Sequence, residues 1–322
     1  VLLIKGADWF VESSEKIGLA LKISPFIVGV TIVAVGTSFP ELASSLAAVF
    51  KDAPEIVAAN VIGSNIANIL LIVGLAAVAT KSFLAVKRSL IDIDLPLLAS
   101  VTVLFGFILL DGKITQLEGL LLLLAFLVYL LYTIYQRGFE LEKPLLEEMA
   151  PGQVVEILPS RIERRLVKTP VEEKLNFKVF LFLILGIVFL SLGANYLIDS
   201  VLKLAEILKI GVTIITILAV AIGTSLPELV VSVRAAVQKK YEIALGNVFG
   251  SNLFNSLVVI GLPAIIKSLL VDSVTFQIGF PFMVVATILL IISGITRRIS
   301  VWEGAIFLII YILFVAKLFG WF

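Results

Sequence analysis

The sequence has 322 residues, of which 60% are hydrophobic and 15% are charged, and its formal net charge is +1. Soluble domains carry roughly a quarter charged residues, so this composition excludes an ordinary soluble protein, and the small net charge gives no electrostatic basis for binding nucleic acid. Cysteine and histidine are absent from the sequence, which excludes disulfides and thiolate or imidazole metal sites. A metal bound by this chain must therefore have oxygen ligands, which favours Na⁺, Ca²⁺ or Mg²⁺.

Apolar segments long enough to cross a bilayer account for most of the chain. One long polar stretch, 137–174, separates the fifth segment from the sixth; it carries charges of both signs and four prolines, so we expect a solvent-exposed loop. The sequence therefore predicts a polytopic membrane protein. Its ten expected spans are about 1–20, 25–50, 54–80, 89–110, 114–136, 175–207, 212–238, 242–267, 272–296 and 300–320.

A seven-residue motif occurs twice and reveals an internal repeat. Residues 36–42 read GTSFPEL and residues 223–229 read GTSLPEL, which is an offset of 187. Near the end of each copy, Glu118 matches Glu303 at an offset of 185, and each of these glutamates is expected to open the last span of its copy. Each copy holds five spans, and an odd number forces the second copy to enter the membrane from the opposite side.

The repeat predicts the fold class. We expect an all-α polytopic membrane protein of ten transmembrane helices, arranged as two inverted five-helix repeats with broken helices at a midmembrane ion site. Val1 aligns with Val188, and the second-copy helix is expected to begin near Asn176, so 188 − 176 = 12 residues of the first helix are expected to be missing. The expected parts are a first half over 1–136, a loop over 137–174 and a second half over 175–322.

Lysine and arginine in the connections predict the orientation of the chain. The connections on the side of the 137–174 loop carry more of these residues than those on the opposite side, and cytoplasmic loops are enriched in them. We therefore expect the loop in the cytoplasm and both termini outside. The expected partners are the lipid bilayer and inorganic cations, with no nucleic acid and no obligatory protein partner.

Each copy of the motif interrupts a span and places a glutamate near its middle. An ionisable residue inside a membrane is costly, which makes it a candidate functional residue. Pro40 lacks an N–H group, so we expect the helix to break there and carbonyls such as that of Ala34 to turn toward a cation. Thr37 and Ser38 supply hydroxyl oxygens. Glu41 lies at the positive start of the next half-helix, which favours its ionised form. The second copy repeats the set with Ala221, Thr224, Ser225 and Glu228.

A second polar pattern follows each motif. Residues 60–68 read NVIGSNIAN and residues 247–255 read NVFGSNLFN, and side chains four apart share one helix face. The last asparagine of each pattern lies 27 residues after a glutamate, since 68 − 41 = 27 and 255 − 228 = 27. Amides and hydroxyls in a span more often join helices than bind ions, but this recurrence favours ligation. The expected ligands are Ser64, Asn68, Ser251 and Asn255; the expected braces are Asn60, Asn65, Asn247 and Asn252; and Gly63 and Gly250 are expected to allow close helix approach.

The paired GTSxPE and GSNxxN segments resemble the two alpha repeats of the cation/calcium antiporter superfamily, most closely its sodium/calcium exchanger branch of prokaryotic type. The resemblance covers nearly the whole chain outside 137–174. It implies a midmembrane site where Ca²⁺ and Na⁺ compete, no cofactor, and a prokaryotic cytoplasmic membrane. It also implies alternating access, in which the first and sixth helices slide past the other eight. The ligands that it implies are Glu41, Glu228, Thr37, Ser38, Thr224, Ser225, Ser64, Ser251 and Asn68, with the carbonyls of Ala34 and Ala221.

Position 255 departs from the pattern of many relatives. These relatives, including the potassium-dependent exchangers, carry aspartate where Asn255 stands here. The resemblance therefore does not extend to potassium dependence, and the expected site has two carboxylates rather than three.

The charge of the expected site is compatible with three functions. Two carboxylates neutralise one Ca²⁺, two Na⁺ or two protons, so the chain fits Na⁺/Ca²⁺ antiport, or H⁺/Ca²⁺ antiport with the glutamates as proton carriers. The third function is a passive cation channel or an intramembrane enzyme. A channel should show an open row of ligands rather than one closed cage, and an enzyme would lack a histidine or cysteine as nucleophile or base. The sequence thus favours a transporter with no enzymatic activity.

Overall fold

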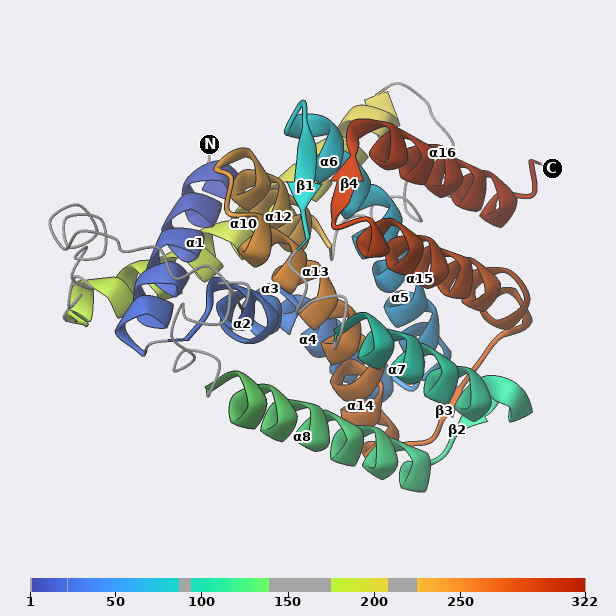
Figure 1. Cartoon of the computed structure of the whole chain (residues 1–322). Coiled ribbons are helices and arrows are strands. Elements are labelled where there is room, and N and C mark those ends of the chain that lie inside the picture. The colour runs from blue at the N-terminus through green and yellow to red at the C-terminus, as the bar shows by residue number, and fades with distance from the viewer. Residues whose placement is uncertain (1, 22, 87–93, 139–174, 208–224, 322) are drawn as a thin grey trace, which may run out of the picture.

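The computed structural model describes residues 2–21, 23–86, 94–138, 175–207 and 225–321. Within these ranges each of the ten expected spans contains a helix, so the all-α prediction is confirmed. The seventh span is described only from Ser225 onward, and the loop predicted over 139–174 lies outside the described residues. Figure 1 shows the helices packed into one bundle.

The first repeat contains broken helices that the structure divides into short elements. In chain order these are α1 (Leu2–Ala20), α2 (Pro25–Val28), η1 (Gly29–Val33), α3 (Ala34–Thr37), α4 (Phe39–Phe50), α5 (Glu55–Ile66), η2 (Ala67–Val73), α6 (Gly74–Ala79), β1 (Phe83–Ala85), α7 (Leu95–Ile108), η4 (Leu109–Asp111), β2 (Lys113–Ile114) and α8 (Gln116–Gly138).

The second repeat follows the same order as far as it is described. Its elements are α10 (Phe177–Ile207), α12 (Leu226–Val237), α13 (Tyr241–Phe254), η7 (Asn255–Val259), α14 (Gly261–Ile266), β3 (Leu269–Leu270), η8 (Thr275–Gly279), α15 (Phe280–Ile295), β4 (Arg298–Ser300) and α16 (Val301–Leu318).

Helix length and hydropathy identify the membrane-crossing segments. Five described helical segments are long and apolar enough to cross a bilayer, and a bent pair, Pro25–Thr37 with Phe39–Phe50, makes a sixth. Of the other four expected spans, α1 is rich in charged residues, α7 and α10 have shorter apolar stretches, and α12 follows residues outside the described ranges. The five segments are Glu55–Ala79, Gln116–Thr133, Tyr241–Ile266, Thr275–Ile295 and Val301–Leu318.

The third span of each repeat forms the centre of the bundle. The segments Glu55–Ala79 and Tyr241–Ile266 are each 78% buried, whereas Gln116–Thr133 and Val301–Leu318 are 22% and 28% buried. A segment that is buried by protein in the middle of a membrane can carry polar side chains without exposing them to lipid. These two central segments are the ones that carry the NxxGSNxxN patterns.

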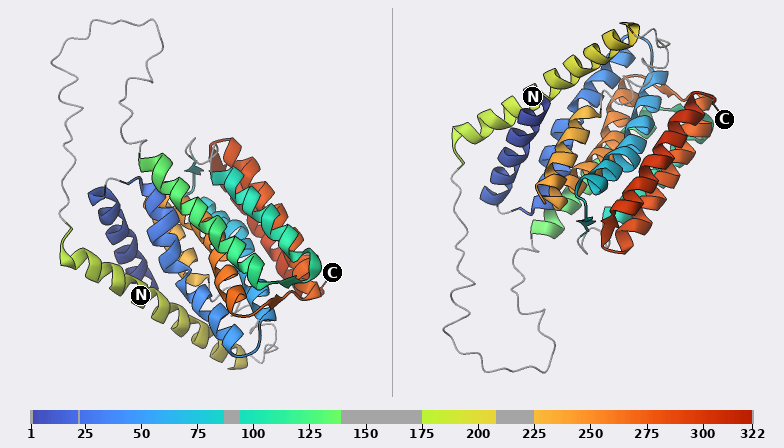
Figure 2. Two further views of the ribbon diagram at one scale, coloured as in Figure 1. Left: turned by 90° about the horizontal axis from the view of Figure 1, so that it is seen from below. Right: turned by 90° about the horizontal axis from the view of Figure 1, so that it is seen from above.

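Two short antiparallel ribbons join the repeats, and they were not predicted. Strand β1 pairs with β4, and β2 pairs with β3, so each ribbon takes one strand from each repeat. β1 and β3 follow the third spans of their own copies, while β2 and β4 precede the fifth spans. Figures 1 and 2 show the two ribbons at opposite ends of the bundle. This exchange of equivalent strands at opposite ends supports the inverted arrangement of the repeats.

The start of the last span is built identically in both copies. The backbone N–H of Thr115 donates to Glu118 Oε2 at 2.7 Å, and that of Ser300 donates to Glu303 Oε2 at 2.7 Å. A side chain that reaches back in this way completes a capping box and satisfies a free N–H at the helix start. The two glutamates therefore open the last spans, as predicted.

Close helix approach through Gly250 is confirmed. A Cβ at Gly250 would overlap the carbonyl oxygen of Val30 and lie 2.6 Å from Ala34 Cβ. Only glycine lets η1 and α3, which carry the first half of the broken helix, lie this close to α13. A Cβ at Gly63 meets no described atom within 4 Å, but the equivalent of Val30 is residue 217, outside the described ranges, so for Gly63 close approach stays a prediction.

Helices α1 and α10 form a pair at one edge of the bundle, as Figure 2 shows. Their contact is close, because a Cβ at Gly6 would lie 2.9 Å from the Leu190 nitrogen. Ion pairs tie α1 to the bundle: Arg234 donates to both oxygens of Asp8, with its shortest N–O distance at 2.6 Å. These contacts hold the first helix against the second-repeat helix that carries Glu228.

Candidate cation site

The first copy of the motif forms the predicted helix break. Segments Pro25–Thr37 and Phe39–Phe50 meet at 41°, and the residue between them, Ser38, has φ −86° and ψ 7°, outside helical geometry. Pro40 lies at the start of the second segment, where a missing N–H costs nothing. The Ala34 carbonyl accepts the Ser38 N–H at 2.9 Å, so it is paired, and only its remaining lone-pair capacity is open to a cation.

The second copy has the same geometry where it is described. Ser225, which precedes α12, has φ −87° and ψ 8°, within one degree of Ser38 in each angle. Equivalent residues 187 apart thus share an irregular backbone conformation, which supports a second break. The predicted ligands Ala221 and Thr224 lie outside the described residues.

Both glutamates are buried at the start of a half-helix. Glu41 is 0% exposed and Glu228 is 1% exposed, and each lies in the first turn of its segment. The positive end of a helix dipole stabilises a carboxylate at this position. The other predicted side-chain ligands that the structure describes are buried as well: Thr37, Ser38, Ser64, Asn68, Ser225, Ser251 and Asn255.

Ser38 brings the two repeats into direct contact. Its hydroxyl donates to Glu228 Oε1 at 2.9 Å, and its Oγ also lies 2.9 Å from Ser251 Oγ. A motif serine of the first copy therefore touches both the motif glutamate and the stripe serine of the second copy. The predicted ligands from the two halves meet in one place.

Each glutamate-bearing helix packs against the other repeat's asparagine turn. Helix α4, which carries Glu41, contacts η7, which begins at Asn255; helix α12, which carries Glu228, contacts η2, which contains Asn68. Both η2 and η7 are π-helical turns at equivalent positions. Such turns are rare and often occur at functional sites. No residue pattern in the sequence predicted them.

Several buried oxygens of this cluster have no hydrogen-bond partner among the described residues. They include Ser64 Oγ, Asn68 Oδ1, Ser225 Oγ, Glu228 Oε2 and Asn255 Oδ1. A buried polar atom left without a partner costs about 1–3 kcal/mol, so such a group normally has a ligand or water. Carboxylate, hydroxyl and amide oxygens are the ligands that Na⁺ and Ca²⁺ prefer. The cluster therefore fits a cation.

One residue near the site was missed by sequence reasoning. Ser232 Oγ accepts a hydrogen bond from Asn247 Nδ2 at 2.9 Å, and Asn247 Oδ1 accepts one from the Thr37 hydroxyl at 3.0 Å. Ser232 thereby braces Asn247, which in turn holds a predicted ligand. Its signal was available, because Ser45 and Ser232 each follow a motif glutamate by four residues and both are buried.

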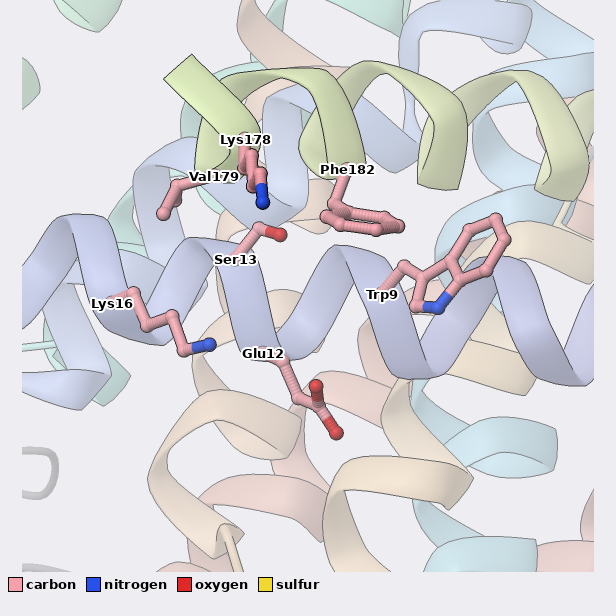
Figure 3. Close-up of a pocket in the computed structure, with 7 residues that line it drawn as sticks. All are labelled: Trp9, Glu12, Ser13, Lys16, Lys178, Val179 and Phe182. Carbon is pink, nitrogen blue, oxygen red and sulfur yellow. The ribbon is translucent and has the colours of Figure 1, made fainter. Parts of the chain in front are cut away.

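A separate hollow of about 300 Å³ lies between α1 and α10 (Figure 3). Figure 3 shows Trp9, Ser13 and Phe182 facing one another across the two helices, with Lys16 and Lys178 beside them. None of the predicted ligands lines it. The cation site is thus the buried cluster of oxygens at the centre of the bundle.

Two inverted repeats that meet at a buried cluster of oxygens define an inverted-repeat membrane transporter. The chain belongs to the sodium/calcium exchanger family, because the family model described as "Sodium/calcium exchanger protein" matches residues 1–135 and 178–320. This confirms the resemblance that the motifs indicated.

Individual relatives are similar over almost the full chain. The chain is 34% identical to the putative antiporter CaxA of Alkalimonas amylolytica, covering 97% of this chain and 93% of that protein. It is 33% identical to the sodium/calcium exchanger MaX1 of Methanosarcina acetivorans, covering 99% and 96%. Among solved structures, the sodium–calcium exchanger NCX_Mj matches with a TM-score of 0.78 and 30% identity, covering 98% of this chain and 95% of that one. The ten-helix inverted-repeat fold agrees with this match.

Proposed function

We propose that this protein exchanges Na⁺ for Ca²⁺ across a membrane by alternating access. The observation that carries the proposal is the contact between repeats, in which Ser38 of the first motif donates to the buried Glu228 of the second at 2.9 Å. Family membership and the similarity to MaX1 and NCX_Mj support Na⁺ coupling and do not favour H⁺ coupling. The test is Na⁺-driven Ca²⁺ uptake into proteoliposomes, which should fail without a Na⁺ gradient.

The proposed ligands are oxygens from both repeats around the two glutamates. Ser38, Glu228 and Ser251 supply the contact described above, and Asn68 and Ser64 supply unpaired oxygens from the central helix of the first repeat. The full proposed set is Glu41, Glu228, Thr37, Ser38, Thr224, Ser225, Ser64, Asn68, Ser251 and Asn255, with the carbonyls of Ala34 and Ala221.

Charge balance explains why one cation exchanges for another. Two ionised glutamates are neutralised by one Ca²⁺ or by two Na⁺, and a third Na⁺ would make exchange electrogenic. An empty site would leave the charges of Glu41 and Glu228 bare inside the membrane, which costs several kcal/mol. The empty protein therefore rarely reorients, and this restriction couples the outward flux of one ion to the inward flux of the other.

We further propose that the protein lies in a prokaryotic cytoplasmic membrane with both termini outside. The lysine and arginine bias of the connections supports this orientation. Because the sequence has no cysteine, cysteines introduced singly at positions 150 and 322 can be labelled with an impermeant maleimide. We expect position 150 to label from the cytoplasmic side and position 322 from the outside. Labelling of both positions from the same side would contradict the inverted arrangement.

Exchange is expected to be independent of K⁺, because Asn255 keeps a neutral amide in the site. We expect Asn255→Asp to raise affinity for an additional cation or to make transport more sensitive to pH, since a third carboxyl among like charges resists ionisation. The measurement is Na⁺-dependent Ca²⁺ flux at several pH values with and without K⁺, with Asn60→Asp as the control on the polar face of α5. A K⁺ requirement in the wild type refutes the charge argument, and a variant that behaves as wild type under every condition removes Asn255 from the site.

A further inference from the structure

An amide–amide hydrogen bond crosses between the repeats beside the proposed site. Asn255 Nδ2 donates to Asn65 Oδ1 at 3.2 Å. Asn255 is 0% exposed and Asn65 is 3% exposed, so no bulk water competes for this bond. Asn65 lies in α5 of the first repeat and Asn255 opens η7 of the second. The bond therefore links a brace of one repeat to a proposed ligand of the other.

Two acceptors fix the orientation of the Asn65 amide. Asn65 Nδ2 donates to Ser256 Oγ at 2.8 Å and to the backbone carbonyl of Asn252 at 3.3 Å. A carbonyl oxygen can only accept, so the nitrogen of Asn65 must face it. Rotating the amide by half a turn would place two oxygens against each other. The oxygen of Asn65 is therefore the atom presented to the other repeat.

This orientation determines which atom of Asn255 is left for a cation. Since Asn65 presents an oxygen, Asn255 must present its NH₂ group in reply. Its Oδ1 is then the remaining atom, and it has no hydrogen-bond partner in the part of the chain that the structure describes. Asn255 follows Ser251 by four residues, so it continues the helix face that Ser251 presents to Ser38.

The equivalent bond of the other repeat is not made. By the offset of 187, Asn252 corresponds to Asn65 and Asn68 corresponds to Asn255. Asn252 Nδ2 donates instead to Val248 O, one turn earlier in its own helix, at 2.8 Å. Both amide atoms of Asn68 are without a hydrogen-bond partner among the described residues. The bracing of Asn255 by Asn65 is thus a specific feature and does not follow from the repeated sequence alone.

We propose that Asn65 is a positioning residue, which orients the amide of Asn255 so that its oxygen faces the transported cation. The proposal rests on the function proposed above, in which Asn255 is a ligand. Asn65 acts through Asn255 and does not itself touch the cation. It also makes an amide the matched group at position 255, because a carboxylate there has no N–H to donate to Asn65 Oδ1.

The test is a double-mutant cycle on cation binding by the purified full chain. We expect Asn65→Ala to weaken equilibrium ⁴⁵Ca²⁺ binding by about 10- to 100-fold, the usual effect of removing a partner that orients a metal ligand. In an Asn255→Ala background the same change should weaken binding less than about twofold, because the group that it orients is already gone. A loss of the same size in both backgrounds, or no loss in either, overturns the proposal.

Two further variants separate positioning from stability. Asn60→Ala removes an amide from the same helix, whose only described hydrogen bond is a long one of 3.5 Å to Ser44 Oγ, and it should leave Ca²⁺ binding unchanged. Ser256→Ala removes one acceptor of Asn65 but keeps the Asn252 carbonyl. It should produce a smaller loss that also disappears with Asn255→Ala, so the cycle can be completed if Asn65→Ala does not fold. An unchanged affinity in Ser256→Ala would then overturn the proposal.

The single variant Asn255→Ala distinguishes the two levels of inference. If Asn255→Ala binds Ca²⁺ as the wild type does, Asn255 is not a ligand, and the site assignment fails together with the role of Asn65. If Asn255→Ala loses affinity while Asn65→Ala does not, only the positioning role of Asn65 fails.

Discussion

Glu228→Gln and Glu41→Gln are each expected to lower Na⁺-driven Ca²⁺ uptake by more than about 100-fold, with little loss of folded protein. Glutamine keeps the shape of glutamate, and its Oε1 can still accept the hydrogen bond that Ser38 donates to Glu228 at 2.9 Å. It removes one of the two charges that face the cation. Removing one partner of a buried charge pair costs about 3–5 kcal/mol, and each 1.4 kcal/mol is about tenfold in affinity.

The matched control for these variants is Glu55→Gln, which changes an exposed glutamate in the first turn of α5. It removes the same charge from the protein without touching the site, so uptake should stay at the wild-type level. Thermal unfolding of each purified variant reports folding separately from transport. Robust Na⁺-driven uptake by either site variant would show that the two glutamates have a structural role only.

Gly250→Ala is expected to destabilise the protein by about 3 kcal/mol, the upper range for overpacking a tight core. The added Cβ would lie 2.7 Å from Val30 Cα and 2.6 Å from Ala34 Cβ, atoms that cannot rotate away. The strain can be relieved only by moving η1 and α3 away from α13. Such a movement would also shift Thr37 and Ser38, so Ca²⁺ binding should weaken together with the melting temperature.

Gly279→Ala is the control for this effect. A Cβ at Gly279 meets only a methyl group of Ile62 among the described atoms, at 3.0 Å, and a side chain can adjust. Thermal unfolding in detergent should therefore place Gly279→Ala close to the wild type and Gly250→Ala well below it. Equal melting temperatures for the two variants would contradict the close approach of α13 to the broken helix.

The sequence predicted the architecture because hydropathy and repetition act over long distances. Ten apolar segments and an offset of 187 were enough to infer five spans in each copy, and five is odd, so inversion followed. Pro40 and Pro227 predicted where each helix breaks, and the Ser38 geometry agrees with this. Glu118 and Glu303 predicted helix starts because a capping box is a local pattern that spans four residues.

Contacts between the repeats could not be predicted in the same way. The bonds from Ser38 to Glu228 and from Asn255 to Asn65 join residues 190 apart in both cases, and no local pattern specifies such a pairing. The π-helical turns η2 and η7 have no residue signature. The strands β1 to β4 contain two or three residues each, too few to show the alternation that marks a strand. Residue types predicted the membership of the site, and only the packing predicted its internal bonds.

The most direct test of the proposed function is ⁴⁵Ca²⁺ uptake into proteoliposomes that contain the purified protein and are loaded with Na⁺ or, in a parallel set, given only a pH gradient. We predict rapid uptake when internal Na⁺ faces a Na⁺-free solution, loss of uptake when Na⁺ is equal on both sides, and no uptake with the pH gradient alone. Glu228→Gln proteoliposomes provide the background. Uptake driven by the pH gradient and indifferent to Na⁺ would contradict Na⁺/Ca²⁺ exchange and establish H⁺ as the coupling ion.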